Sequence, residues 1–231
     1  QFVIPRGGWS SLVGRMIVAA NQVGVTLAPG SSAESLKLDS SGKLSSLRIS
    51  GKDVECDAVV LATSPSTSSR LLETAGLDTN LLDACTEHRV AALDVALEGR
   101  PMRPYSGMFD EKSGVIAVDM TSPDRIPEGA EPETCTILHA VNLTGDGPDA
   151  LAQIKELLDS RCSGWRNMSS VRRSTESVML HPCSHDQRVE ASLHIEAGIG
   201  LAGTHVISDY HLSDAAVDTG RAAAKTLTKS R

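Results

Sequence analysis

Apolar residues near the start of the chain recur at the spacing of a helix. The helix-spaced positions are Leu12, Met16, Ile17 and Ala20. Ser10 can accept a backbone hydrogen bond at the amino end of such a helix, and Gly24 can end it. The apolar-rich residues 25–27 follow the glycine. The pattern therefore predicts a helix that starts after Ser10 and leads into a short strand.

A hairpin and a buried strand are predicted next. Turn-forming residues 40–43 separate the apolar runs 36–38 and 44–49, and a second turn at Gly51 and Lys52 follows. Residues 56–65, CDAVVLATSP, then hold a continuous apolar run that ends at a proline. Such a run predicts a buried strand entering a helix that has Pro65 in its first turn.

The middle of the chain predicts a sheet with one covering helix. Gly76 should end a helix that contains Leu71 and Leu72, and residues 80–87 should form another. Residues 149–160 place their leucines and isoleucine on a single helical face. Residues 123–132 are polar and rich in turn formers, which predicts a surface loop. The predicted strands are residues 90–97, 115–120, 136–141 and 170–180.

The last thirty residues carry the most informative pattern. A short apolar strand stops at Gly203, a loop follows, and an alanine-rich helix begins with Ser213 as its predicted cap. This arrangement brings a bare backbone and a helix N-terminus close to an anionic ligand. The residues 198–203 also match the glycine fingerprint of dinucleotide-binding folds, but that motif needs a helix starting at its glycines. A loop-like segment follows instead, so we interpret the glycines as flanks of a terminal strand.

Composition and charge exclude several classes of partner. The chain has 231 residues, of which 40% are hydrophobic and 3% aromatic, so its core must consist mainly of aliphatic side chains. A net charge of −7 and the lack of a basic run argue against nucleic acid and anionic membrane surfaces as partners. Five dispersed cysteines without a C-x-x-C spacing favour the reducing cytoplasm. No apolar stretch is long enough for a membrane span. Because Gln1 is not an initiator methionine, we expect a piece of a longer protein.

Both ends of the chain resemble FAD-dependent oxidoreductases of the amine oxidase and phytoene desaturase superfamily, which includes proteins similar to protoporphyrinogen oxidase. Residues 7–12 resemble the Gly-Gly segment of that family, residues 56–65 its "aDaVVlAtpp" strand, and residues 200–204 its terminal Ala-Gly-Asp or Ala-Gly-Glu strand. Thr204 stands where the family has the acid, so it can still form a hydrogen bond but brings no charge. The cofactor-binding residues that the resemblance implies are Ala33, Ala62, Thr63, Gly203, Thr204, Asp214, Ala215 and Ala216.

The resemblance implies an α/β (α+β) fold: a partial FAD-binding fold of the glutathione-reductase type with an inserted substrate domain that has a mixed or antiparallel sheet. We assign residues 1–85 and 195–231 to the flavin-binding fold and residues 86–194 to the substrate domain. The family's N-terminal glycine fingerprint is absent from these residues, so the isolated chain is expected to be inactive.

The implied reaction transfers a hydride equivalent from a small-molecule substrate to flavin. No lysine lies between Lys155 and Lys225 and aromatic residues are few, which disfavours amine oxidation and favours an apolar, isoprenoid-like substrate. The resemblance leaves the catalytic residues and the oligomeric state unassigned. The alternative is a non-catalytic module that keeps the fold for binding or scaffolding, which Thr204 and the missing fingerprint favour.

Other candidate sites have simpler explanations. His181, Cys183 and His185 could share a face of an extended chain, but a fourth zinc ligand is missing, so no metal is expected. His205 and His211 flank the terminal loop, where proton handling or an ordinary loop role both remain open. The acidic residues Glu128, Glu131 and Glu133 are interpreted as a solvated loop. The methionines Met102, Met108 and Met120 could line an apolar pocket or fill the core.

Overall fold

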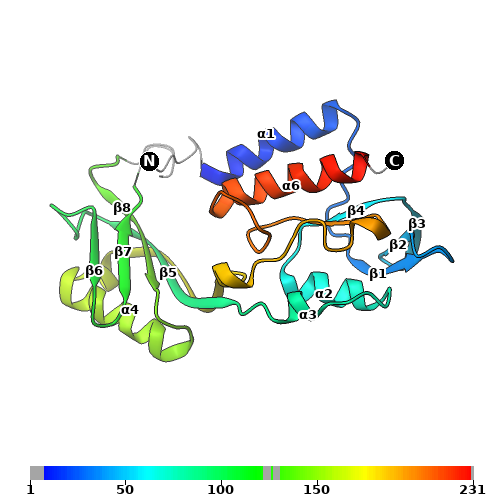
Figure 1. The fold of residues 1–231 in the computed structure, drawn as a ribbon. Helices are drawn as coiled ribbons and strands as arrows, with labels where there is room; N and C mark the ends of the chain where they lie inside the picture. Colours follow the sequence, from blue (N-terminus) through cyan, green and yellow to red (C-terminus); the bar gives the residue numbers. More distant parts are fainter. Residues whose placement is uncertain (1–7, 122–125, 127–130, 230–231) are drawn as a thin grey trace. The chain divides into compact units, whose positions relative to one another are not determined.

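The computed structural model describes residues 8–121, 126 and 131–229 of the chain (Figure 1). The chain divides into two compact units. Unit 1 contains the residues up to Leu27 together with Arg89–Met179. Unit 2 contains Ala28–His88 and the residues from Leu180 onward. Most of the acidic loop expected at residues 123–132, including Glu128, lies outside the described residues.

Unit 1 is built on a five-stranded sheet in the order β6-β7-β8-β5-β9. Strands β5 and β8, β6 and β7, and β7 and β8 pair antiparallel. The four strands predicted from the sequence are confirmed as β5, β7, β8 and β9. Strand β6, which is short and contains a glycine, was not predicted. The strands are β5 (His88–Glu98), β6 (Gly107–Asp110), β7 (Val115–Asp119), β8 (Cys135–Asn142) and β9 (Ser169–His181).

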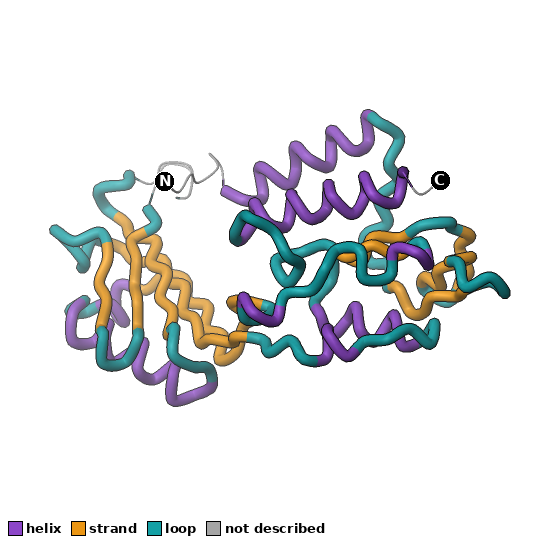
Figure 2. The backbone as a smooth tube through the Cα atoms, viewed as in Figure 1, coloured by secondary structure: helices purple, strands orange, loops and turns teal. Residues whose placement is uncertain are grey.

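Helix α4 (Gly147–Arg161) covers one face of this sheet, as Figure 2 shows. Its residues Leu151, Ile154 and Leu158 are buried against the sheet, which confirms the predicted single apolar face. The short helix α5 (Trp165–Met168) adds the fully buried Trp165 to the same core. Helices α4 and α5 therefore close the core face of the sheet. On the opposite face, Val90, Ala92 and Val141 form a smaller buried cluster.

Helix α1 (Gly8–Gln22) confirms the first predicted helix, although it begins two residues before Ser10. None of its residues is buried. The strand predicted at residues 25–27 is wrong, because these residues have no regular secondary structure. A strand needs a neighbour for its backbone groups, and Val25 and Leu27 are instead exposed.

Unit 2 begins with the three-stranded sheet β1-β2-β3. Strands β1 (Ala33–Leu38) and β2 (Leu44–Ile49) pair antiparallel, so the predicted hairpin is confirmed. Its turn contains Gly42 at φ +79°, a backbone conformation that suits glycine. Strand β3 (Lys52–Glu55) follows the second predicted turn and pairs with β2.

The predicted strand-to-helix segment is also confirmed. Strand β4 (Val59–Leu61) leads into α2 (Pro65–Glu73), which has Pro65 at its first position. The side chain of Ser64 caps α2 by accepting a hydrogen bond from the amide of Thr67 at 3.3 Å. The helix expected at residues 80–87 is wrong in length, because α3 is only Asn80–Asp83. The amide of Thr86 is drawn away from α3, since it donates to the Oε1 atom of Gln187 at 2.9 Å.

The chain ends with strand β10 (Ile199–Leu201) and helix α6 (Leu212–Lys229), preceded by the short helices η1 (His185–Gln187) and η2 (Ile195–Ala197). No helix starts at the glycines before Thr204, so the terminal-strand interpretation is confirmed. Helix α6 packs closely on β10, because a Cβ atom on Gly200 would lie only 3.1 Å from the Cβ atom of Ala223. Among the described helices, none is long and apolar enough to cross a membrane.

Candidate functional site

Two strand ends in unit 2 bring four of the expected cofactor residues together. Strands β4 and β10 pair in parallel, with Leu61 opposite Leu201. Parallel strands end at the same edge of a sheet, and ligands of α/β folds bind outside the carboxyl ends of such strands. Immediately after β4 and β10, respectively, come Ala62-Thr63 and Ala202-Gly203-Thr204. The amide of Ala202 donates to the carbonyl of Leu61 at 3.0 Å, which holds the two ends side by side.

Gly203 is held in a conformation that excludes a side chain. Its φ angle is +136°, and a Cβ atom there would lie 2.8 Å from the ring of His205. The amide of Gly203 donates to the hydroxyl of Thr219 at 3.0 Å. That hydroxyl also lies 2.8 Å from the carbonyl oxygen of Ala215 in α6, to which it can donate. The strand end is therefore fixed to the helix, and the ring of His205 occupies the space beside the Gly203 Cα atom.

The amino end of α6 differs from the prediction in its cap. Ser213 is not the cap, because the helix already begins at Leu212, which has φ +52°. The amide of Ala215 donates to the carbonyl of His211 at 3.3 Å, so it is not one of the free amides of the first turn. The free donors of an α-helix lie on its first residues, here from Leu212 to Asp214. These amides, and not that of Ala215, are the ones available to a ligand.

The remaining expected cofactor residues lie in different places. Asp214 and Ala216 are exposed on the first turn of α6, whereas Ala215 is fully buried. Ala33 begins β1 in the other sheet of unit 2. It packs against the core that contains Leu61 and Leu201, so it is not at the shared strand end itself. Thr204 is half-buried in the loop that follows β10.

His205 is a buried histidine beside this strand end. Its side chain is almost completely enclosed, with 2% of the residue exposed. Burial lowers the pKa of the imidazole to about 4, so the ring is neutral at neutral pH. Its Nε2 atom has no hydrogen-bond partner among the described residues. This nitrogen is also shielded from solvent, so a ligand could reach it only after the surrounding residues moved.

The sheet of unit 1 carries a second cluster, which the sequence did not predict. On the face away from α4, the Nδ1 atom of His139 in β8 lies 2.5 Å from the Oδ1 atom of Asp94 in β5. The two residues are direct cross-strand partners, and about half of each side chain is exposed. An aspartate that accepts from one imidazole nitrogen fixes the tautomer of the ring and leaves the other nitrogen free for a ligand.

Apolar side chains flank this pair on the same face. Strand register places Phe109, Ile116, Val141 and Ala92 in one row across four strands. Val118 stands directly opposite His139 in the neighbouring row. The exposed Phe109 and the half-buried Ile116 and Val118 are therefore the apolar side chains accessible on the face of the histidine and carboxylate pair, whereas Ala92 and Val141 are buried. A register of this kind depends on pairing between distant strands, so spacing along the sequence contains no signal for it.

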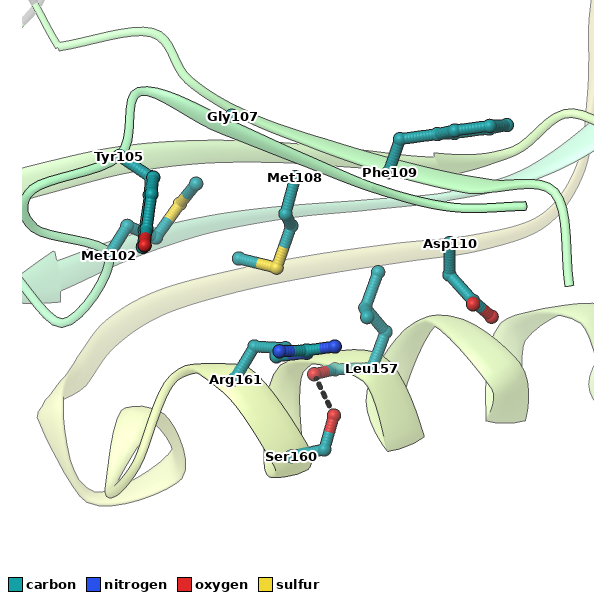
Figure 3. Close-up of a pocket in the computed structure, with 9 residues that line it drawn as sticks. All are labelled: Met102, Tyr105, Gly107, Met108, Phe109, Asp110, Leu157, Ser160 and Arg161. Atoms are coloured by element: carbon teal, nitrogen blue, oxygen red, sulfur yellow. Dashed lines mark hydrogen bonds between the residues drawn. The ribbon is translucent and has the colours of Figure 1, made fainter. Parts of the chain in front are cut away.

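A pocket of about 540 Å³ lies between β6 and α4, on the covered side of the sheet (Figure 3). Met102 and Met108 line it, as one of the two interpretations expected, and Met102 is also buried in the core. Arg161 of α4 contributes a charged side chain, whereas Phe109 points away from the helix (Figure 3). Met120 is not among the residues that line this pocket.

Of the three possible zinc ligands named from the sequence, the structure describes the side chains of His181 and Cys183 but not that of His185. The Nδ1 atom of His181 lies 2.8 Å from the backbone carbonyl of Cys183, so this ring nitrogen is engaged by backbone. No group of three or more metal-ligating side chains occurs in the part of the chain that the structure describes.

Comparisons with known proteins identify the fold. No protein-family model and no curated protein sequence matches the chain. An oxidoreductase from Methanosarcina mazei matches with a TM-score of 0.70 and 13% identity, over 96% of this chain and 55% of that chain. A protoporphyrinogen oxidase candidate from Exiguobacterium sp. 255-15 matches with a TM-score of 0.62 and 17% identity, over 96% and 51%. Glycine oxidase from Bacillus cereus matches with a TM-score of 0.55 and 13% identity, over 95% and 55%.

Identities this low show the fold alone. The chain spans about half the length of these solved structures. Its mixed α/β fold with antiparallel sheets matches about half of the fold of FAD-binding oxidoreductases. The fold class and the resemblance expected from the sequence are thereby confirmed.

Proposed function

We propose that this chain is part of an FAD-dependent oxidoreductase, in which unit 2 binds the cofactor and unit 1 presents the substrate. One observation carries the proposal. The parallel strands β4 and β10 end side by side, and α6 follows β10 and begins at Leu212. Strand ends combined with a helix N-terminus form an anion-binding arrangement that suits the phosphates and the flavin carbonyls of FAD.

The residues present fit the cofactor. Gly203 has no side chain at the end of β10, and the ring of the buried His205 fills the space that a Cβ atom would take there. We assign Ala62, Thr63, Gly203 and Thr204 to the flavin and phosphate side, with the amides from Leu212 to Asp214 as further donors. Ala33 and Ala216 remain proposed contacts from the resemblance, whereas Ala215 is buried and its amide is already bonded to the carbonyl of His211. When bound, FAD accepts a hydride equivalent from a substrate C–H or N–H bond.

The chain contributes electrostatics and positioning to this chemistry. The amino end of α6 adds positive potential where a negatively charged cofactor group would lie. Thr204 supplies a hydroxyl for hydrogen bonding but no charge. Asp214 lies exposed in the first turn of α6, and its negative charge opposes the potential of the helix. The helix amino end, the Thr204 hydroxyl and the Asp214 charge together set the affinity for the cofactor, and they take no part in the bond changes of the reaction.

On the substrate side, we assign proton handling to His139 and its orientation to Asp94. The exposed Phe109 and the half-buried Ile116 and Val118 support an apolar substrate beside the pair. A desaturase-like or dehydrogenase-like reaction on an isoprenoid-like small molecule fits this surface better than oxidation of a charged amine. Burial of apolar substrate atoms against these side chains gives binding affinity, and a hydrogen bond to His139 orients the substrate.

The second candidate is a non-catalytic module that keeps the fold for binding or scaffolding. The observation that favours it is Thr204, which replaces the acid that the family places beside the ribityl chain. Under this alternative, the strand end would bind little or no flavin, and His139 would have no effect on any redox reaction.

The test uses the longest natural protein that contains this chain, loaded with FAD. Oxidised flavin is yellow, so anaerobic loss of colour on adding isoprenoid alcohols or hydrocarbons reports hydride transfer. We expect bleaching with at least one such compound, slowed about 10²- to 10⁴-fold in His139→Gln. Protein that retains FAD but is bleached equally fast in His139→Gln contradicts the assigned role. Failure to retain FAD at all supports the non-catalytic module.

A further inference from the structure

The pocket between β6 and α4 lies within unit 1, on the side of the sheet opposite to His139. Its volume is about 540 Å³, and sites for small molecules typically measure about 300 to 1,000 Å³. Burial alternates along β6, so Met108 and Asp110 are half-buried whereas Phe109 is exposed. The register of β6 with β7 and β8 places Met108 and Asp110 on the core face, toward α4. These two side chains therefore enter the pocket from the strand.

Three apolar side chains, Met102, Met108 and Leu157, form what we call the apolar floor of the pocket. Met102 is almost fully buried, with 3% exposed, whereas Met108 and Leu157 are half-buried. Both half-buried side chains pack against the main core of unit 1. Figure 3 shows Met108 pointing toward α4 and Leu157 pointing toward the strand. A ligand that covers the exposed atoms of this floor gains affinity through burial.

Arg161 gives the pocket a positive charge. It lies in the last turn of α4, and its guanidinium lies on the side of the helix that faces the strand (Figure 3). The nearby Asp159 pairs instead with Arg166, with 2.7 Å between Oδ2 and Nη2. Among the described residues, none forms a hydrogen bond or an ion pair with the guanidinium of Arg161. Its planar donors are therefore available to a carboxylate, which can accept two parallel hydrogen bonds from them.

Acidic side chains in and beside the pocket restrict the charge of a ligand. Asp110 lines the pocket and accepts a hydrogen bond from the amide of Ser113 at 3.1 Å. The hydrogen bond from the Ser113 hydroxyl holds the pKa of Asp110 below its usual range, so the carboxylate is charged at neutral pH. Glu156 lines an adjoining hollow of about 320 Å³ that Arg161 also borders. These two carboxylates repel a doubly charged phosphate more strongly than a ligand with a single negative charge.

We propose that the pocket between β6 and α4 binds a medium-chain aliphatic monocarboxylate. The carboxylate accepts hydrogen bonds from the guanidinium of Arg161, and the alkyl chain lies on the apolar floor. The exposed Tyr105 lines the same pocket and covers part of the chain. One charged anchor beside an apolar surface is the usual composition of a small-molecule site.

The experiment titrates the isotope-labelled chain with butanoate, hexanoate and octanoate and follows its amide NMR signals. Octanoate should shift the signals of residues 105–110 and 157–161, with little change at Asp94 and His139. The affinity should rise with chain length, by up to about fourfold for each methylene that is buried. Octanol has the same chain without the charge, so it should bind about fivefold more weakly than octanoate or worse. The inference does not depend on flavin binding or on the proposed reaction, because every residue of the site belongs to unit 1.

Variants separate the charge from the apolar floor. Arg161→Gln should weaken octanoate binding about fivefold or more and remove the preference over octanol. The matched control is Lys155→Gln, which removes the same charge from α4 at a residue that does not line the pocket. Its octanoate affinity should stay within about twofold of the wild type, because salt screens distant charges. Met108→Gln keeps the length of the side chain but makes the floor more polar, so affinity should rise less steeply with chain length.

Three results would overturn the proposal. The first is that octanoate leaves the signals of residues 105–110 and 157–161 unchanged. The second is that the shifts centre on Asp94 and His139, which would place octanoate on the opposite face of the sheet. The third is equal octanoate affinity in the wild type and Arg161→Gln, which would leave Arg161 only a structural role at the carboxyl end of α4. The wild-type titration with the ligand series decides the question even where a variant fails to fold.

Discussion

The hydroxyl of Thr219 in α6 accepts a hydrogen bond from the amide of Gly203 at 3.0 Å. Thr219 is almost fully buried, with 1% exposed, and its hydroxyl also lies 2.8 Å from the carbonyl oxygen of Ala215. One side chain therefore connects the end of β10 to the first turns of the helix that follows it. The geometry of the proposed cofactor edge depends on this connection.

Thr219→Val should destabilise the chain by about 1 to 3 kcal/mol, because it leaves the half-buried Gly203 amide without this partner. The matched control is Thr226→Val, since the exposed Thr226 hydroxyl bonds only to the carbonyl of Ala222 in the same helix. Urea unfolding measures both changes. Equal losses of stability in the two variants would show that Thr219 does not hold the strand end.

Two glycine substitutions should change stability in opposite directions. Gly203→Ala places a Cβ atom against the ring of His205 at a positive φ angle, which should cost about 1 to 3 kcal/mol. Gly220→Ala meets no atom within 4 Å inside α6, so it should stabilise by about 0.5 to 1 kcal/mol. Thermal unfolding of both variants gives the comparison. A neutral Gly203→Ala would mean that the strand end is not as confined as the geometry indicates.

His205 makes stability depend on pH. Burial lowers its pKa from 6.5 to about 4 in the folded chain. Between these values the unfolded chain binds a proton that the folded chain excludes, so stability falls as pH is lowered through this window. The loss approaches about 3 kcal/mol near pH 4. In His205→Leu, the free energy of unfolding should fall less steeply between pH 6.5 and 4; an unchanged slope would assign the dependence to other groups.

Asp214→Asn should tighten FAD binding. Its carboxylate lies in the first turn of α6, where a negative charge opposes the attraction of the helix N-terminus for an anionic ligand. Removing a charge worth about 0.3 to 1 kcal/mol strengthens binding roughly two- to fivefold. Asp149→Asn, in the first turn of α4, is the matched control and should have no effect. Quenching of flavin fluorescence measures the two affinities.

Much of the fold follows from local signals in the sequence. The turn-forming residues 40–43 set the position of the hairpin of β1 and β2, and Pro65 sets the start of α2. Both effects come from the backbone preferences of these residues themselves. The strand expected at residues 25–27 fails because its existence depends on a partner that local sequence cannot supply. The start of α6 was misplaced because Leu212 adopts a positive φ angle, which an apolar side chain rarely does.

In the candidate site too, local sequence signals predict some residues, and others depend on contacts between distant segments. Gly203 and Thr204 could be assigned because strand, glycine and helix are consecutive in the chain. The pairing of Asp94 with His139 depends on the register of β5 and β8, and it has no spacing signal in the sequence. Residues 1–85, 86–194 and 195–231 as functional domains remain a prediction.

The most direct test of the account is an amide NMR titration of this chain with FAD. Because half of the matching folds lies outside the chain, binding should be weak, but it should be localised. The account predicts the largest shift changes at Thr63, Gly203, Thr204 and Ser213, with little change along α4. No shift changes at saturating FAD, or changes confined to the sheet of unit 1, would contradict the claim that the ends of β4 and β10 bind the cofactor.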